Sequence, residues 1–138
     1  MPTVDPQVAN ELYGRLHEAI KGSLVRSCHD LSEGGLAVAL AEMAFAGDLG
    51  VEIDLQAALD KVGLNGTEYL FSESNSRFLV EVEPEREAAF QALMAGCAER
   101  LGQVVAGDEV VVSQGSETLL RSKLSDLKRA WQSPLDWE

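Results

Sequence analysis

Cysteine and basic residues are scarce in this chain of 138 residues. Its two cysteines, Cys28 and Cys97, are far apart and belong to no CxxC or Cys/His ligand pattern. We therefore expect free thiols in a reducing cytoplasm and no structural zinc site. Only 11 Lys and Arg face 23 acidic residues, for a formal net charge of -12. That charge repels nucleic acid phosphates and anionic membrane surfaces, so we expect neither as a partner.

Long hydrophobic runs and targeting segments are also lacking. No apolar stretch reaches the roughly 20 residues of a membrane-spanning helix, and the N-terminus shows no basic and then apolar signal pattern. These absences indicate a soluble, cytosolic protein. The length is that of one ordinary domain, and 46% hydrophobic residues suffice for a single core. We expect residues 1–138 to form one domain.

Apolar periodicity predicts the elements of the first half. A helix is expected over residues 5–21, ending near Gly22, with one apolar stripe formed by Val8, Leu12, Leu16 and Ile20. Further elements are expected as follows: strands over residues 23–30, 50–55 and 67–71, a helix over 34–45 and a short helix over 56–63.

The second half begins with a half-buried strand over residues 77–84, stopped by Pro84. A helix over residues 85–102 with Gly102 as its C-cap follows, and then two β segments within 103–114. A last helix is capped by Ser122 or Ser125 and ends before Pro134. This order predicts an α+β fold, a mixed β-sheet with packed helices.

The segment "HDLSEGG" has polar residues that invite both a local and a functional interpretation. Asp30 and Glu33 are spaced to form a capping box for the helix that follows. His29 beside Asp30 resembles a general base with its orienting carboxylate, but adjacent residues of an extended chain point apart. A histidine satisfied by a hydrogen bond at a strand end is the favoured interpretation. Ser32 lies in no nucleophile-elbow motif.

Gly34 and Gly35 need a separate explanation, since glycine in a helical turn is destabilising. Either another backbone packs closely there, or a ligand such as phosphate approaches the free N–H groups of the helix start. Both explanations stay open, with close packing favoured. The following helix has one charged residue, Glu42, and its apolar character predicts burial on most sides by a partner domain or subunit.

The loop "SESNSR" lies between two expected strands. It is either a simple turn or a site in which Glu73, Ser74 and Asn75 bind a hydroxyl-rich ligand such as a ribose. Arg77 would then lie near a phosphate or pair with Glu73. We expect Trp131 and Trp137 to dock the C-terminal segment onto a core or a neighbour.

Four segments together carry a family resemblance, "CHDLSEGGLAVALAEMAFAG", "GVEIDL", "LFSESNSRFLVEV" and "LKRAWQSPLDW". They resemble the C-terminal domain of the bacterial short-chain phosphoribosylformylglycinamidine synthases. The resemblance covers roughly residues 5–137. It implies a fold like the C-terminal domain of aminoimidazole ribonucleotide synthetase, and a chain that is a piece of a longer multidomain protein.

The resemblance also implies an activity and partners. Such enzymes use ATP, with magnesium, to convert formylglycinamide ribonucleotide to the amidine, and a glutaminase subunit supplies ammonia. The implied partners are the remaining synthetase domains, the glutaminase subunit and a small accessory subunit. The catalytic histidines and principal magnesium ligands of the family lie in segments absent from this sequence, so we assign no catalytic or metal-binding residue.

The resemblance assigns a binding role that stays conditional. In the family's first C-terminal copy the loop reads glutamate, serine, glutamine, glutamate, arginine, whereas residues 73–77 here read ESNSR. The chain resembles the second copy, so its loop is expected at the pseudo-symmetric position, as an auxiliary nucleotide site or a structural element. The candidate nucleotide- or substrate-binding residues are His29, Asp30, Ser32, Gly34, Gly35, Glu73, Ser74, Asn75 and Arg77.

Three functions follow from these observations. The leading one is a noncatalytic C-terminal domain of an ATP-dependent ligase of purine biosynthesis. The second is a free-standing binding domain that self-associates through the helix at residues 36–45. The third is the C-terminal domain of another superfamily member, such as a thiamine monophosphate kinase relative.

Overall fold

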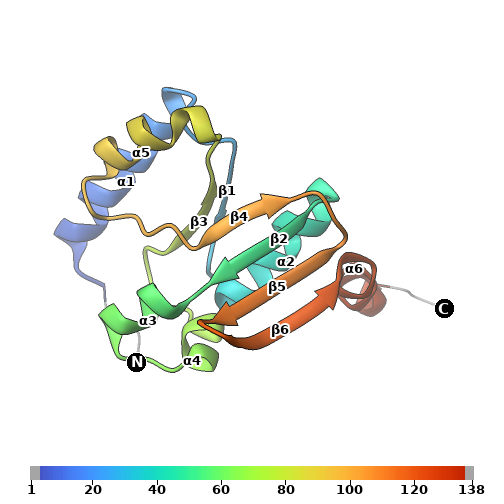
Figure 1. Cartoon of the computed structure of the whole chain (residues 1–138). Helices are drawn as coiled ribbons and strands as arrows, with labels where there is room; N and C mark the ends of the chain where they lie inside the picture. Colours follow the sequence, from blue (N-terminus) through green and yellow to red (C-terminus); the bar gives the residue numbers. More distant parts are fainter. Residues whose placement is uncertain (1–3, 136–138) are drawn as a thin grey trace.

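The computed structural model describes residues 4–135. These residues form two β-sheets and six α-helices (Figure 1). In chain order the elements are α1 (Pro6–Lys21), β1 (Ser27–Asp30), α2 (Gly35–Gly47), β2 (Gly50–Asp54), α3 (Gln56–Val62), α4 (Gly66–Phe71), β3 (Phe78–Glu81), α5 (Glu87–Met94), β4 (Gly102–Val105), β5 (Glu109–Gln114), β6 (Glu117–Lys123) and α6 (Leu124–Gln132). Short 3-10 turns at Pro84–Arg86 and Ser133–Leu135 complete the order.

The main sheet has four strands in the order β4-β2-β5-β6. β2 and β5 are parallel, while the β2–β4 and β5–β6 pairs are antiparallel. The predicted mixed sheet and α+β fold are therefore confirmed. Register pairs Val51 with Val110 and Ile53 with Val112, and all four side chains are buried. Because residues two apart share one face of a strand, these side chains form the sheet's contribution to the main core.

A second, smaller unit lies beside the main sheet. β1 and β3 form an antiparallel pair, and α1 lies against α5 next to them (Figure 1). Ala19, Phe90 and Met94 form a separate small core here, with Val80 and Val82 packed against it. Leu79 packs against the main core instead. β3 is therefore apolar on both faces, which departs from the one-sided burial expected of this strand.

The stripe predicted for α1 is wrong at both ends. Val8 is 61% exposed and Ile20 50% exposed, whereas Ala9, Leu16 and Ala19 are buried. Four residues overshoot one helical turn of 3.6 residues by about 40°, so a strict every-fourth series winds off the buried face within three steps. The end of the helix at Gly22 is as predicted, since its N–H donates to the Glu18 carbonyl at 2.8 Å.

Residues 67–71 form helix α4 and not the predicted strand. Asn65 and Glu68 make a reciprocal capping box: the Glu68 N–H donates to Asn65 Oδ1 at 2.9 Å, and the Asn65 N–H donates to Glu68 Oε2 at 3.0 Å. The aromatic residues of this segment favour strands, but the local cap satisfies the helix start without any partner strand.

The helix predicted over residues 85–102 is much shorter. α5 ends at Met94 because Ala95 and Gly96 take left-handed conformations, with φ of 47° and 84°. Gly102 lies in β4 and is not a C-cap, and a Cβ there would lie 2.0 Å from the Glu52 carbonyl oxygen. The apolar residues keep their helical spacing beyond Met94, so this spacing did not show that the helix ends there.

The C-terminal part combines correct segments with a missed strand. Two β segments do occupy residues 103–114, but β2 lies between β4 and β5, so they are not a hairpin. Strand β6 was not predicted and contains Ser122. α6 follows with Lys123 as its N-cap and no side-chain cap, so neither serine caps it. The helix ends before Pro134, as expected.

The two cysteines, Cys28 and Cys97, are free thiols and are exposed. Within residues 4–135, no helix combines the length and apolar character needed to cross a membrane.

The capping box of α4 can be tested with Asn65→Ala. We expect it to lower the free energy of unfolding by about 1 kcal/mol, because the Glu68 N–H loses its acceptor. Urea unfolding measures this difference. Asn10→Ala, at an exposed position inside α1, is the matched control and should change stability by less than about 0.5 kcal/mol. Equal effects of both substitutions would contradict the capping role.

Candidate functional site

The glycine turn before α2 is explained by close packing. Gly35 has a φ of 62°, and a Cβ on it would lie 2.7 Å from the Leu70 carbonyl oxygen and 2.9 Å from that of Ser72. Gly34 has a φ of 73°, and its Cβ would collide with the Val38 side chain at 2.2 Å. Both positions therefore exclude other residues on conformational and steric grounds. The packing alternative accounts for the glycines without any ligand.

The N-terminus of α2 is capped from a distant loop. The Gly34 N–H donates to Glu73 Oε1 at 2.8 Å, across 39 positions of sequence. The capping box predicted between Asp30 and Glu33 is wrong. The helix begins at Gly35, which leaves Asp30 too early to reach its first amides, and Asp30 accepts a hydrogen bond from the Ser32 hydroxyl instead.

Glu73 also places a negative charge at the N-terminus of α2. The partial positive charge of a helix N-terminus suits a phosphate or a carboxylate equally. Here the Glu73 carboxylate accepts one hydrogen bond at this end, from the N–H of the N-cap residue Gly34. The hydrogen bond from Ser32, together with backbone N–H donation and nearby His29, lowers the pKa of Asp30 below its ordinary value.

Arg77 binds the C-terminal end of α4. Its Nη1 donates to the Ser72 carbonyl at 3.1 Å and to the Ser72 hydroxyl at 2.6 Å, and Nη2 donates to the Tyr69 carbonyl at 3.5 Å. The guanidinium also lies over the Tyr69 ring, 4.7 Å from its centre. A cation at a helix C-terminus is favourable because the last carbonyls lack partners. The predicted pairing of Arg77 with Glu73 is absent, because Arg77 binds these carbonyls.

The rest of the loop is exposed. Ser74 and Asn75 have exposed side chains, while the Ser76 hydroxyl lies 3.0 Å from the Tyr13 hydroxyl of α1. The structure thus brings the two predicted motifs together at the start of α2. Glu73 and Arg77 are used to hold the backbone, and Ser74 and Asn75 remain on the surface.

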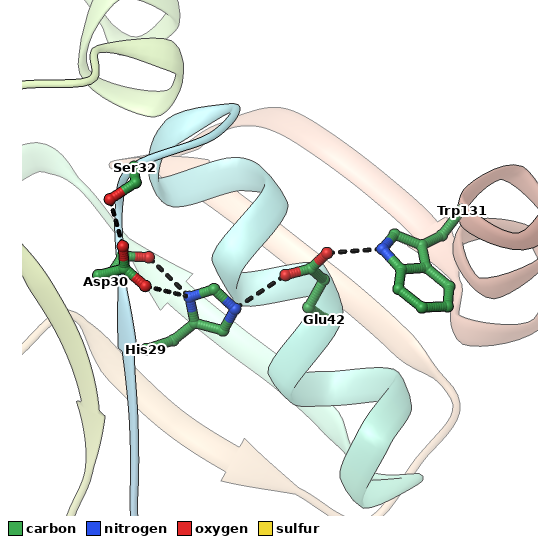
Figure 2. Close-up of polar contacts among 5 residues, drawn as sticks. All are labelled: His29, Asp30, Ser32, Glu42 and Trp131. Carbon is green, nitrogen blue, oxygen red and sulfur yellow. Dashed lines mark hydrogen bonds and ion pairs between the residues drawn. The ribbon is translucent and has the colours of Figure 1, made fainter.

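A second polar cluster connects three elements (Figure 2). His29 Nδ1 lies 2.6 Å from the Asp30 carbonyl, and Nε2 lies 2.8 Å from Glu42 Oε2. The Trp131 indole donates to Glu42 Oε1 at 2.6 Å, and its ring lies 5.8 Å from that of Phe45. The interpretation of His29 as a hydrogen-bonded residue at a strand end is confirmed. Trp131 docks as predicted, and Trp137 lies outside the described residues.

The role of Glu42 was missed in the sequence. The signal for it was a single charge on an otherwise apolar helix, which must find a polar partner or reach solvent. The carbonyl of Asp30 and then Glu42 raise the pKa of His29, outweighing the opposing effect of its partial burial. Burial and the nearby Asp30 raise the pKa of the Cys28 thiol.

Other elements of the chain cover much of helix α2. Its buried residues share the main core with apolar residues of β2, β5, α3, α4 and α6. Helix α2 also contacts α4 and α6 directly (Figure 1). Ala46 and Gly47 at the end of α2 are exposed, and its other residues are buried or half-buried. Much of the apolar surface of α2 is thus covered within the chain itself, and the expected cover by a partner domain or subunit stays a prediction.

A cavity of 610 Å³ lies elsewhere, between the small core and the main sheet. Its lining is mainly apolar, with Leu16, Met43, Leu79, Phe90 and Leu101 among its residues. Of the candidate binding residues only Arg77 borders it. Within residues 4–135 no three His, Cys, Asp or Glu side chains cluster in a way that would hold a metal ion.

Comparisons with known proteins agree on one family. The sequence profile of "AIR synthase related protein, C-terminal domain" matches residues 2–114. The phosphoribosylformylglycinamidine synthase subunit PurL of Carboxydothermus hydrogenoformans is 36% identical over 140 residues, which covers 99% of this chain. The PurL subunit of Leuconostoc mesenteroides is 41% identical over 115 residues, covering 83% of the chain.

Solved structures match the fold as well. Thermotoga maritima PurL complexed with FGAR superposes with a TM-score of 0.82 at 21% identity, covering 92% of this chain and 22% of that protein. The hydrogenase maturation protein HypE reaches a TM-score of 0.60 at 18% identity. The chain spans 18% and 14% of the length of the two PurL relatives.

Gly35→Ala tests the close packing at the turn. We expect a loss of at least about 2 kcal/mol of unfolding free energy, because both the left-handed backbone and the contact with the Leu70 carbonyl oppose a Cβ. Chemical denaturation measures the loss. Gly47→Ala, in the same helix with open space around it, should change stability by less than about 0.5 kcal/mol. A harmless Gly35→Ala would show that the contact yields easily.

Glu73→Ala tests the cap that crosses from the loop to α2. We expect a loss of about 1 kcal/mol, typical of a helix deprived of its N-terminal acceptor. Glu33→Ala is the matched control, since Glu33 is exposed and takes no part in the observed cap; its effect should stay below about 0.5 kcal/mol. Thermal or urea unfolding of both variants decides. The reverse order of effects would restore the local capping box.

Proposed function

Since the chain belongs to the AIR synthase related proteins and matches their C-terminal domain, we propose that it serves as the C-terminal domain of an ATP-dependent ligase. The reaction proposed is the conversion of formylglycinamide ribonucleotide to the corresponding amidine. The observation that carries the proposal is the similarity to PurL over 99% of the chain at 36% identity. The likeness of the fold to that of PurL agrees with the proposal.

We propose that the nucleotide and magnesium of this reaction bind to other parts of the complete enzyme. PurL of Thermotoga maritima is described in complexes with ATP and with ADP. Two observations support this placement: Glu73 already accepts the Gly34 N–H at the start of α2, and within residues 4–135 no three His, Cys, Asp or Glu side chains cluster in a way that would hold a metal ion. We therefore assign no catalytic step to this chain.

The role that remains for the candidate residues is positional. His29, Gly34, Gly35, Glu73 and Arg77 hold the junction of β1, α2 and α4. Ser32, Ser74 and Asn75 are exposed beside that junction. We propose that they meet polar groups of a neighbouring domain or of a ligand held mainly by that domain.

The proposed partners follow from the same relatives. A PurLQS assembly of Thermotoga maritima is known, so we propose the remaining synthetase domains, a glutaminase subunit and a small accessory subunit as partners. The two unpaired cysteines suit the reducing cytoplasm in which we place the protein.

A domain exchange tests the proposal. This chain replaces the matching C-terminal segment of Carboxydothermus hydrogenoformans PurL, and ATP turnover is measured with formylglycinamide ribonucleotide and ammonia. We expect a rate within about tenfold of the parent enzyme, a barrier change under about 1.4 kcal/mol. The isolated chain should show no turnover.

Two controls give the exchange its meaning. The parent enzyme without its C-terminal segment should be inactive, and the chimera carrying Gly35→Ala should lose activity together with thermal stability. A chimera that melts like the parent but has no activity would contradict the ligase assignment and favour an independent binding domain. Turnover by the isolated chain would contradict its noncatalytic role.

A further inference from the structure

Glu42 is a bridge between two elements that are remote in sequence. Its Oε2 faces His29 of β1, and its Oε1 accepts from Trp131 of α6, 89 positions away (Figure 2). The His29 side chain is 35% exposed and that of Glu42 26% exposed. The cluster is thus partly shielded from water, yet protons can reach it.

Both ring nitrogens of His29 face groups that only accept hydrogen bonds. Nδ1 faces the Asp30 carbonyl at 2.6 Å, and Nε2 faces the Glu42 carboxylate at 2.8 Å. A neutral imidazole has one N–H, whereas the imidazolium has two. Only the protonated ring satisfies both contacts at once. Removing the proton leaves one nitrogen lone pair against an oxygen lone pair, whichever tautomer forms.

The charged groups around His29 favour the proton. Asp30 of its own strand places Oδ1 3.6 Å from Nδ1, and Glu42 approaches from α2. β3 contributes Leu79 as the register partner of His29, and α6 contributes the uncharged indole of Trp131 through Glu42. Within residues 4–135, neither Glu42 nor Asp30 forms an ion pair with a Lys or Arg side chain. The Asp30 carbonyl, and then the two carboxylates, raise the pKa of His29 above the ordinary histidine value.

The two ends of α6 are held differently. At its start, Leu124 is buried and Leu127 packs against the main core. At its end, Trp131 remains 49% exposed and is held by Glu42 and by the tilted contact with Phe45. A change at Glu42 therefore acts on the last turn of α6 and leaves the start of the helix in place.

We propose that His29 is a proton-operated latch that fixes the last turn of α6 to α2 through Glu42. With His29 protonated, its ion pair fixes the Glu42 carboxylate in the position that accepts the Trp131 indole. With His29 neutral, Glu42 loses the ion pair and the ring keeps a proton for only one of its two contacts, so the last turn loosens. Because the folded state binds the proton more tightly, the latch contribution is complete below the ordinary histidine value and is lost as pH rises through the folded-state pKa.

The indole proton of Trp131 reports the latch directly. In the full chain carrying Trp137→Phe, we follow its Nε1–H resonance by NMR, and acrylamide quenching of its fluorescence, between about pH 5.5 and 9, a range that brackets ordinary histidine titration. We expect the resonance to shift with an inflection above the ordinary histidine value. Quencher access should rise over the same interval.

The chain offers a matched control, because it has two histidines. His29→Gln should abolish the titration of the indole signal, and His17→Gln, at an exposed position on α1, should leave it unchanged. Glu42→Gln keeps an acceptor for the indole but removes the charge. It should move the inflection down toward the ordinary histidine value and reduce its amplitude.

The proposal is overturned by an indole signal that does not change with pH in the parent chain. It is equally overturned by a titration that persists in His29→Gln or disappears in His17→Gln. If His29→Gln does not fold, the Glu42→Gln shift decides alone: an inflection that stays in place rules out the latch.

Discussion

The constraint on which the junction of α2 and α4 depends is the close approach of the Gly35 backbone to the carbonyl groups of Leu70 and Ser72. No side chain fits between them, so the start of α2 and the end of α4 are set at backbone contact. That contact places the loop after α4 directly over the first amides of α2. Glu73 can then reach the Gly34 N–H, and the sheet-facing side of α2 is fixed over β2 and β5.

The loop uses its two charges on two helix ends. Glu73 lies at the N-terminus of α2 and Arg77 at the C-terminus of α4, so each charge has the sign that its helix end favours. A loop with these polar residues resembles a ligand-binding loop, because phosphate and ribose need the same hydrogen-bond donors and acceptors. Here Glu73 and Arg77 form hydrogen bonds with backbone groups of the protein itself. The same chemistry therefore joins the start of α2 to the end of α4, while Ser74 and Asn75 remain exposed.

Sequence periodicity predicted what depends on neighbours in the chain and failed where distant contacts decide. The span of α1 and the strand at β2 follow from local patterns, and the family resemblance added the fold. α4 was missed because its cap lies in Asn65, outside the aromatic segment. The end of α5 was missed because the left-handed turn begins at Ala95, one residue before the glycine that could have signalled it. In the site, the glycines signalled close packing correctly. No pattern could connect Glu73 to Gly34, or Glu42 to Trp131, because those pairs exist only after folding.

The charged side chains of this domain lie near its surface, where several of them are engaged with other groups of the chain. Catalytic acids and bases need pKa values matched to their task, which proteins achieve by burial beside chosen partners. Within residues 4–135 no charged or polar side chain is fully buried. Asp30 and Asp54 have their pKa values lowered by hydrogen bonds, which keeps them ionised and unfit as bases near neutral pH. His29 is held between acceptors by both nitrogens. Both ring nitrogens are thus engaged within the chain, where the ionisation of His29 acts on Glu42 and through it on the last turn of α6.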